Sequence, residues 1–553
     1  MPVDTHSDDG SRRGSRIPSL LPCYFGGAGG VILFAYSALV VACGAYAASP
    51  EGGILPAVSV ASALMPLLVA FPFVVRIVRR IPAPAPCADR LVDTLPKRVA
   101  WFVLFFAVPF ATLLVWQRGF APMAMSPDVF DQYRQVVDPS VPYNDWHPVI
   151  HTLFALKLPL LATGSVDSIV VFQAAGFSVM LAWAAAAFLR HGGIGWAVAL
   201  ELLVLLNPAV PSTLMYPWKD LWFGIACGFA TTGCMKALLT NGEWVRRWSR
   251  ALPMGIALAC ACMLRHNGIL FALPCAALLM WMGGRRHGSV VVCSALAIVA
   301  AMRLVLYPML AVEAPDKRTT EIVGLPMSVV ANVMKEDHGS LDEDTREFAY
   351  AVAPQAVWDE YVPTGYNSIK WNGETDGDAI EKQGVGGVLL AMARCLAASP
   401  DAAARGFLGV TRIVWDPNAA GWHKVRTFDE ILPDIGDYPE LRHGGKSPGL
   451  GRSLASWLDA ADESPLRFLA SVGLGLLVTI ALVCLRLFPI RSSLDRRKLL
   501  LGIAPLSYCF GTMLLLTGPD YRFFFAMHAV FPLVAFAVLA KPDAKGLPAT
   551  RTQ

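Results

Sequence analysis

The stretch that decides the fold is ALPMGIALACACMLRHNGILFALPCAALLMWMGGRR, residues 251–286. Two apolar runs, 251–264 and 268–283, are separated by a polar interruption and followed by Arg285 and Arg286. Each run is shorter than the roughly 20 residues that cross a bilayer core. We interpret the runs as two short membrane helices that meet near one surface, against the alternatives of one continuous helix or a re-entrant hairpin. This choice decides which face of the membrane each later segment reaches.

Further apolar runs repeat the pattern along the chain. We expect spans at 28–48, 54–75, 98–116, 167–189, 194–210, 218–238, 288–310, 465–487, 498–517 and 522–540. Of the 553 residues, 55% are hydrophobic and 16% are charged, whereas soluble proteins carry about 25% charged residues. The sequence therefore predicts an all-α polytopic membrane protein with about 12 transmembrane helices.

Lysine and arginine gather in short clusters between the apolar runs, as they do in cytoplasmic loops. These residues are Arg12, Arg13, Arg16, Arg76, Arg79, Arg80, Arg90, Lys97, Arg98, Arg190, Arg246, Arg247, Arg250, Arg285, Arg286, Arg491, Arg496, Arg497, Lys498 and Lys541. If 251–283 crosses twice and the N-terminus is inside, all of them are cytoplasmic. A single crossing would divide them between the two faces. We therefore expect a multi-pass protein of the cell membrane with both termini in the cytoplasm and 311–464 outside.

This order of spans predicts the domain organisation. The expected parts are a cytoplasmic tail at 1–27, two additional helices with a linker at 28–96, a transmembrane module at 97–310 with its first outer loop at 117–166, an extracytoplasmic domain at 311–464, C-terminal helices at 465–540 and a cytoplasmic tail at 541–553. The outer segment is long enough for a small folded domain. We expect it to be of mixed structure, helical over 388–413 and loop-like over 358–378.

The first outer loop carries the most conspicuous polar residues, in SPDVFDQY at 126–133 and YNDWHPVIHT at 143–152. Pro127 after Ser126 suits the start of a helix, so that Asp128 and Asp131 share a face. Such carboxylates can act as a general base or bind a cation, or can merely cap the helix. His147 can bind phosphate or transfer a proton, or can simply be hydrogen-bonded.

Basic residues also occur at the expected outer ends of spans. They are Lys219, Arg265, His266 and Arg522. The planar fork of arginine matches phosphate oxygens, and an outer arginine opposes the usual charge bias. The alternatives are anchoring at the membrane interface for Lys219 and snorkelling for Arg265.

In the outer segment, Trp358, Tyr361 and Trp371 are interleaved with amides and carboxylates. Aromatic faces beside such groups suit a sugar ring, although ordinary packing explains the same pattern. A net charge of +4 gives no indication of nucleic-acid binding. No phosphate-binding glycine-rich loop, CxxC or HExxH motif occurs, which argues against nucleotide-driven chemistry and a zinc site.

Taken in order, SPDVFDQY, YNDWHPVIHT, KDLWF at 219–223, LRHNGI at 264–269, LPMSVVANVM at 325–334 and PDYRFFF at 519–525 resemble a bacterial multi-pass family of unknown function. That family in turn resembles the GT-C type glycosyltransferases. The resemblance covers about 100 to 540, so the first two spans would precede the shared module.

The resemblance implies transfer of a sugar from a polyprenyl-phosphate carrier on the outer face, to a cell-envelope glycan or protein. It implies that Asp128 is the base, with Asp131 as the fallback, and that Lys219, Arg265 and Arg522 hold the donor phosphate. The acid is not followed by a second adjacent carboxylate, as it is in several members, so the resemblance leaves a divalent metal and the choice of base open. A transporter or flippase of lipid-linked precursors, or an envelope scaffold, is the alternative function. The chain lacks the internal repeat expected of a transporter.

Overall fold

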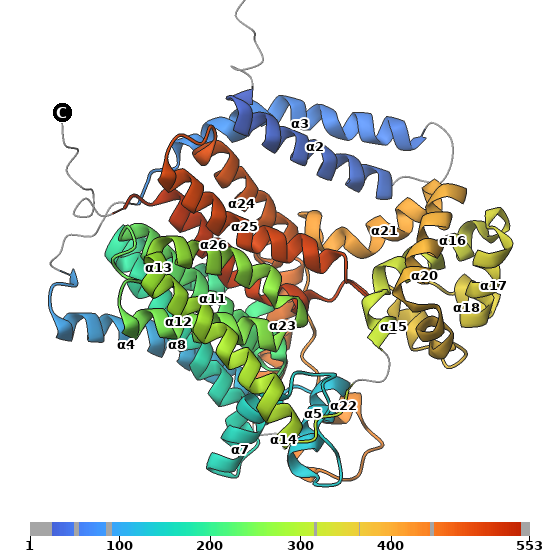
Figure 1. Ribbon diagram of the computed structural model, residues 1–553, viewed down its shortest axis with the longest axis horizontal. Coiled ribbons are helices and arrows are strands. Elements are labelled where there is room, and N and C mark those ends of the chain that lie inside the picture. The colour runs from blue at the N-terminus through green and yellow to red at the C-terminus, as the bar shows by residue number, and fades with distance from the viewer. Residues whose placement is uncertain are drawn as a thin grey trace, which may run out of the picture.

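The computed structural model describes residues 25–48, 55–84, 91–314, 318–363, 365–442 and 447–542 (Figure 1). Within these ranges the chain forms helices without a β-strand, and one isolated bridge pairs Asn144 with Glu313. The expected tail at 1–27 (except residues 25–27), most of the tail at 541–553 and the Arg12–Arg16 cluster lie outside the described residues.

Eleven apolar helices account for the twelve expected spans, because one of them covers two. They are α2 (Ala28–Ala47), α3 (Leu55–Arg80), α4 (Leu95–Gly119), α8 (Asp167–Gly192), α9 (Ile194–Leu205), α11 (Lys219–Leu239), α12 (Trp248–Leu264), α13 (Ile269–Ala301), α24 (Val472–Leu487), α25 (Ser493–Met513) and α26 (Phe525–Leu539). In the described part of the chain, seven helical segments are long and apolar enough to cross a membrane by length and composition. The protein is therefore an all-α, multi-pass membrane protein.

The two short helices expected at 251–283 are present. Helix α12 ends at Leu264, a 3-10 turn (η3, His266–Gly268) follows, and α13 returns alongside α12. Arg246 Nε donates to the Met282 carbonyl oxygen at 3.2 Å, which ties the start of α12 to the far end of the returning segment. The chain turns again at Gly284, where φ is 67°, a value that glycine adopts at little cost. The two short runs therefore cross the bundle separately, and 288–310 starts a third crossing.

The basic clusters that fall within the described residues lie together at one end of this bundle, which we call the basic end. Arg486, in the last turn of α24, donates from Nε to the Val78 carbonyl oxygen at 3.2 Å. Lys498 donates to the carbonyl oxygens of Val538 and Ala540 at 2.8 and 2.6 Å. These bonds join the ends of α3, α24, α25 and α26. Which side of the membrane the basic end faces stays a prediction.

The C-terminal spans differ slightly from their expected bounds. The span expected from 465 begins at Val472, because Pro465–Ala470 forms a 3-10 turn (η7). Helix α25 begins before the expected 498, because Ser492 and Asp495 form a capping box. Such reciprocal bonds satisfy backbone groups at a helix start.

The segment 311–464 divides into two parts. A helical lobe, on the right of Figure 1, has its own hydrophobic core. It contains α15 (Arg318–Ile322), α16 (Gly324–Asp337), η5 (His338–Ser340), α17 (Glu343–Val352), α18 (Gln355–Asp359), α19 (Asn367–Lys370) and α20 (Gly377–Ala398). We expected mixed structure here, and the described residues form only helices and loops. The helix expected over 388–413 is two helices, because the chain breaks at Ser399 before α21 (Pro400–Trp415).

The rest of this segment returns across the other end of the bundle. It runs through α22 (Phe428–Ile431) and η6 (Pro439–Leu441) to α23 (Pro448–Asp462), which packs on α4. The first loop lies at the same end, with α5 (Pro127–Val137) and the segment α6 (Val149–His151), η2 (Thr152–Lys157) and α7 (Leu158–Thr163). We call this the loop end. Residues far apart in the sequence meet here.

Candidate active site

Helix α5 presents the first candidate acid at the loop end. Ser126 caps the helix: its Oγ accepts from the Val129 amide at 3.3 Å and from Trp218 Nε1 at 2.9 Å. The amide of Met125 donates to the Arg426 carbonyl oxygen at 2.9 Å. Asp128 therefore stands in the first turn of a helix that is fixed on both sides. This is the helix start that the Ser126–Pro127 pair predicted.

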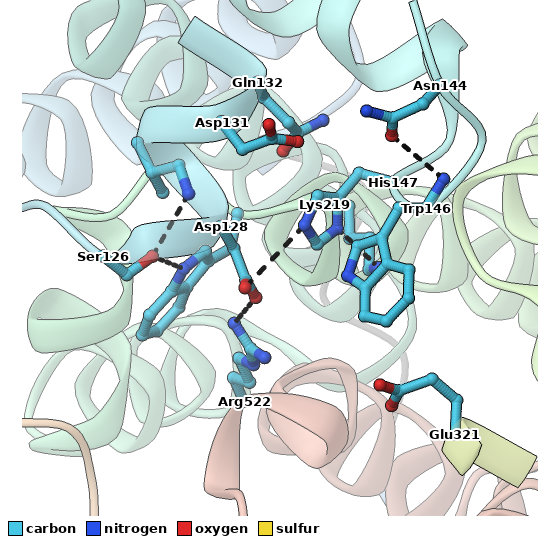
Figure 2. Close-up of polar contacts among 12 residues, drawn as sticks. Ser126, Asp128, Asp131, Gln132, Asn144, Trp146, His147, Lys219, Glu321 and Arg522 are labelled. Carbon is cyan, nitrogen blue, oxygen red and sulfur yellow. Dashed lines mark hydrogen bonds and ion pairs between the residues drawn. The ribbon is translucent and has the colours of Figure 1, made fainter. Parts of the chain in front are cut away.

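Asp128 meets two side chains from distant segments (Figure 2). Its Oδ2 accepts from Arg522 Nη1 at 2.6 Å, and its Oδ1 lies 3.8 Å from His147 Nε2. The Asp128 side chain is 30% exposed and that of His147 is 5% exposed. The carboxylate is thus the accessible member of this group, and the imidazole forms the wall behind it.

Arg522 is held from three directions. It begins the last span in η8 (Tyr521–Phe524), which Asp520 caps by accepting from the Arg522 amide at 3.1 Å. Arg522 Nε lies 2.7 Å from Asp520 Oδ2, and its guanidinium carbon is 5.1 Å from the centroid of the Trp218 ring. His423 Nε2 lies 2.7 Å from Asp520 Oδ1. Arg522 is therefore oriented by its own loop before any ligand arrives.

Lys219 opens α11 and faces His147. Its Nζ lies 2.9 Å from His147 Nδ1. When Lys219 is an ammonium group it can only donate, so in that state Nδ1 accepts and the ring proton of a neutral His147 lies on Nε2. That proton points toward Asp128. No carboxylate within ion-pair distance of Lys219 is found among the described residues.

Arg265 is already paired. Its guanidinium forms an ion pair with Asp220, the second residue of α11, whose side chain is 2% exposed. The guanidinium also lies over the Phe523 ring, 4.6 Å from its centroid, and Arg522 lies over the same ring at 5.5 Å. The site therefore holds three basic side chains (Lys219, Arg265 and Arg522) beside three carboxylates (Asp128, Asp220 and Asp520). Lys219 differs from the two arginines because it contacts the imidazole of His147 and not a carboxylate.

Charges set the protonation states of Asp128 and His147. Burial raises the pKa of Asp128, but the charges of Arg522 and Lys219 hold it below its usual range. Burial lowers the pKa of His147 well below its usual value, and Lys219 lowers it further. His147 is thus neutral at pH 7, and its contact with Asp128 is not an ion pair. The depressed pKa of Asp128 therefore rests on Arg522 and Lys219.

Two other candidates from the first subsection stand apart from this group. The Asp131 carboxylate accepts from Gln135 Nε2 at 2.9 Å, within α5, and Figure 2 draws it away from Arg522. His266 is exposed at the turn between α12 and α13. The structure therefore brings together Asp128, His147, Lys219 and Arg522. Arg265 lies behind this group, where it pairs with Asp220 and shares the Phe523 ring with Arg522.

The aromatic candidates need a correction. Trp358 and Tyr361 are fully buried in the core of the helical lobe, and Trp358 Nε1 donates to the Ala353 carbonyl oxygen at 2.9 Å. Their ring faces are covered by packing, so they are not available to bind a sugar. Trp371 is 70% exposed and lies against the Lys370 ammonium, 4.4 Å from the ring centroid.

The sequence analysis missed three members of the site. Asp520 and Trp218 lie beside residues that it selected, and the outer PDYRFFF stretch itself contains Asp520. His423 had no local signal, because a single histidine in an irregular stretch looks like any surface residue. Among the described residues, no group of three or more His, Cys, Asp or Glu side chains is arranged to hold a metal ion.

A long apolar groove begins beside the site. It has a volume of about 850 Å³ and lies between α4, α8, α11, α12 and the η2 segment. At the loop end its lining includes His151, Phe154, Trp222 and Leu264, the residue before Arg265. The site therefore adjoins a space with the apolar lining that a lipid chain requires.

No protein-family model and no curated protein matches the chain. Among solved structures, the chain is similar to the crystal structure of ArnT from Cupriavidus metallidurans bound to undecaprenyl phosphate. The identity is 14%, the TM-score is 0.31, and the match covers 78% of this chain and 77% of ArnT. At that TM-score the backbones differ too much for roles to be transferred residue by residue.

Proposed function

We propose that the chain is a membrane glycosyltransferase that moves a sugar from a polyprenyl-phosphate donor to a cell-envelope acceptor on the extracytoplasmic face. The observation that carries the proposal is the meeting of Asp128, His147, Lys219 and Arg522 beside the loop end of the apolar groove. A lipid phosphate has a charged head and an apolar tail, and this arrangement suits both.

Lys219 is the first ligand that we assign to the donor phosphate. Its ammonium contacts a neutral imidazole, so binding an anion breaks no ion pair there. Arg265 and Arg522 would have to share their carboxylate partners with the phosphate. In this arrangement the isoprenoid tail enters the groove past Phe154 and Trp222.

Asp128 is the group that we assign to the acceptor proton. In the transfer, the acceptor oxygen bonds to the sugar carbon, its proton passes to Asp128, and the bond from that carbon to the phosphate oxygen breaks. The phosphate leaves with the electron pair, and Lys219 and Arg522 stabilise its charge. Asp128 paired to Arg522 is a weak base. A phosphate that draws Arg522 toward itself raises the basicity of Asp128 when the donor is bound.

The test is sugar transfer by purified protein in nanodiscs, with radiolabelled polyprenyl-phosphate sugar and an envelope extract as acceptor. We expect label to move from the lipid fraction to the extract with the wild type, and not with Asp128→Asn. Exposed Asp434 provides a matched control, Asp434→Asn, that should transfer normally. Label that crosses proteoliposomes without leaving its lipid would contradict the proposal and favour a flippase.

A further inference from the structure

The groove that starts at the candidate site continues to the basic end. Along α12 its lining runs from Ser249 to Leu264, a stretch of roughly 22 Å at about 1.5 Å per residue. The hydrocarbon core of a bilayer is about 30 Å thick. The groove therefore crosses most of the membrane, and each of its ends reaches a different leaflet.

At the basic end the groove is lined by Trp183, Trp244, Ser249 and Arg250. Lys236, in the last turn of α11, lies against both tryptophans, with its Nζ 4.6 Å from the ring centroid of Trp183 and 5.6 Å from that of Trp244. Arg250 packs on Trp244 at 5.5 Å and donates to its carbonyl oxygen at 3.1 Å. Two cations are thus fixed by aromatic rings at the groove's end.

These cations have no counter-charge among the residues that the structure describes. The charged side chains that act on Lys236 are Arg250 and Arg190, both cations, and those that act on Arg250 are Arg247 and Arg190. No carboxylate forms an ion pair with Lys236 or Arg250 in the described part of the chain. Like charges that are partly withdrawn from water repel one another, and an aromatic face offsets only part of that cost. An anion from outside the protein would complete the cluster.

We propose that this end of the groove binds an anionic phospholipid of the cytoplasmic leaflet, with Lys236 and Arg250 on its phosphate and one acyl chain in the groove beside Phe229 and Pro253. The charge complementarity selects an anionic headgroup, and the apolar lining selects a lipid over free phosphate. The site is separate from the donor site at the loop end. It stands whether or not the protein transfers a sugar.

Ordinary basic residues near a membrane surface are the alternative explanation, because anionic leaflets attract them in general. Arg247 provides the matched control. It belongs to the same cluster and is exposed, but unlike Lys236 and Arg250 it lies over neither of the two tryptophans that line the groove. A general surface attraction would depend on Arg247 as much as on Lys236.

The experiment measures lipid retained by the full-length protein, by native mass spectrometry after titration with phosphatidylglycerol or phosphatidylcholine. We expect phosphatidylglycerol to be retained at least tenfold more strongly than phosphatidylcholine. Lys236→Gln and Arg250→Gln should each reduce this preference about tenfold, as loss of one charge-assisted bond would. Arg247→Gln should leave it unchanged. Glycerol phosphate, a headgroup without a tail, should not compete.

Several outcomes would overturn the proposal. Equal reductions in all three variants would indicate surface attraction. Competition by glycerol phosphate would indicate a plain phosphate site. Undecaprenyl phosphate that displaces phosphatidylglycerol from the wild type but not from Lys236→Gln would make the polyprenyl carrier the occupant. Thermal unfolding with and without phosphatidylglycerol gives a second readout, since a variant that folds but loses the lipid-dependent rise in Tm supports the proposal.

Discussion

Arg522 Nη1 donates to Asp128 Oδ2 at 2.6 Å across a separation of 394 positions in the sequence. The bond joins the first outer loop to the start of the last span. Two segments from opposite parts of the 97–540 region therefore meet in this site. This bond also stabilises the ionised carboxylate of Asp128, because the Arg522 charge lowers its pKa while burial raises it. A ligand that competes for Arg522 therefore changes Asp128 directly.

The first prediction concerns Asp128 as the base. Asp128→Asn should fold and bind the donor but transfer sugar roughly 10²–10⁴-fold more slowly, the usual contribution of general-base catalysis. Single-turnover transfer with saturating donor measures this. Asp131→Asn should be nearly unaffected, because its carboxylate is bonded to Gln135 within α5. Normal transfer by Asp128→Asn together with loss in Asp131→Asn would exchange the two roles.

The second prediction ranks the cations at the donor phosphate. Lys219→Ala should weaken polyprenyl-phosphate-sugar binding about 10- to 100-fold, because a charge-assisted bond contributes about 1.5–3 kcal/mol. Arg522→Ala should weaken it in the same range. Arg265→Ala should have a smaller effect on affinity, since Arg265 lies behind the group, is only 10% exposed and is paired with the buried Asp220. Donor affinity in nanodiscs measures all three, and an Arg265 effect larger than that of Lys219 would contradict this ranking.

The sequence could predict the bundle and the gathering of its basic clusters at one end, because both depend on local signals. The length of an apolar run and a nearby arginine are visible without knowing the fold, and they correctly separated α12 from α13 at Arg265. The pairing of charges was not visible. Asp220 follows Lys219 in the chain, yet it pairs with Arg265, because successive residues at a helix start point in different directions.

The aromatic residues show a different limit. Trp358, Tyr361 and Trp371 stand among the same kinds of polar neighbours in the sequence. In the structure the first two fill the core of a lobe built from short helices, while Trp371 is exposed. Short helices leave too few turns for a periodic pattern to distinguish an inward ring from an outward one.

The third prediction tests that burial. Trp358→Ala should destabilise the helical lobe by about 3–5 kcal/mol, the usual cost of removing a large buried aromatic side chain. Trp371→Ala should change the free energy of unfolding little, because the ring is largely exposed. Susceptibility of the lobe to limited proteolysis reports both changes. Equal susceptibility of the two variants would be inconsistent with the core described here.

The fourth prediction follows from the lowered pKa of Asp128. A carboxyl group whose pKa is lower in the folded than in the unfolded protein stabilises the fold at any pH above its unfolded-state pKa, which is near 3.9 for Asp. This stabilisation is lost as the pH falls from there toward the pKa in the folded protein. The Tm difference between wild type and Asp128→Asn should therefore be constant from about pH 7 to about pH 5 and shrink below about pH 4. A difference that already disappears near pH 6 would contradict a lowered pKa for Asp128.

The last prediction concerns the orientation of the whole bundle, on which the proposed leaflet of each site depends. We expect the helical lobe and the loop end to face the outside, because the lysines and arginines lie at the opposite end and positive loops stay in the cytoplasm. Exposed Ser340 in η5 and exposed Glu243 after α11 provide one position at each end. In a background without native cysteines, Ser340→Cys should react with a membrane-impermeant maleimide in intact cells, and Glu243→Cys only after the cells are opened. The reverse pattern would place Asp128 and Arg522 on the cytoplasmic side. That result would contradict transfer to a cell-envelope acceptor on the extracytoplasmic face.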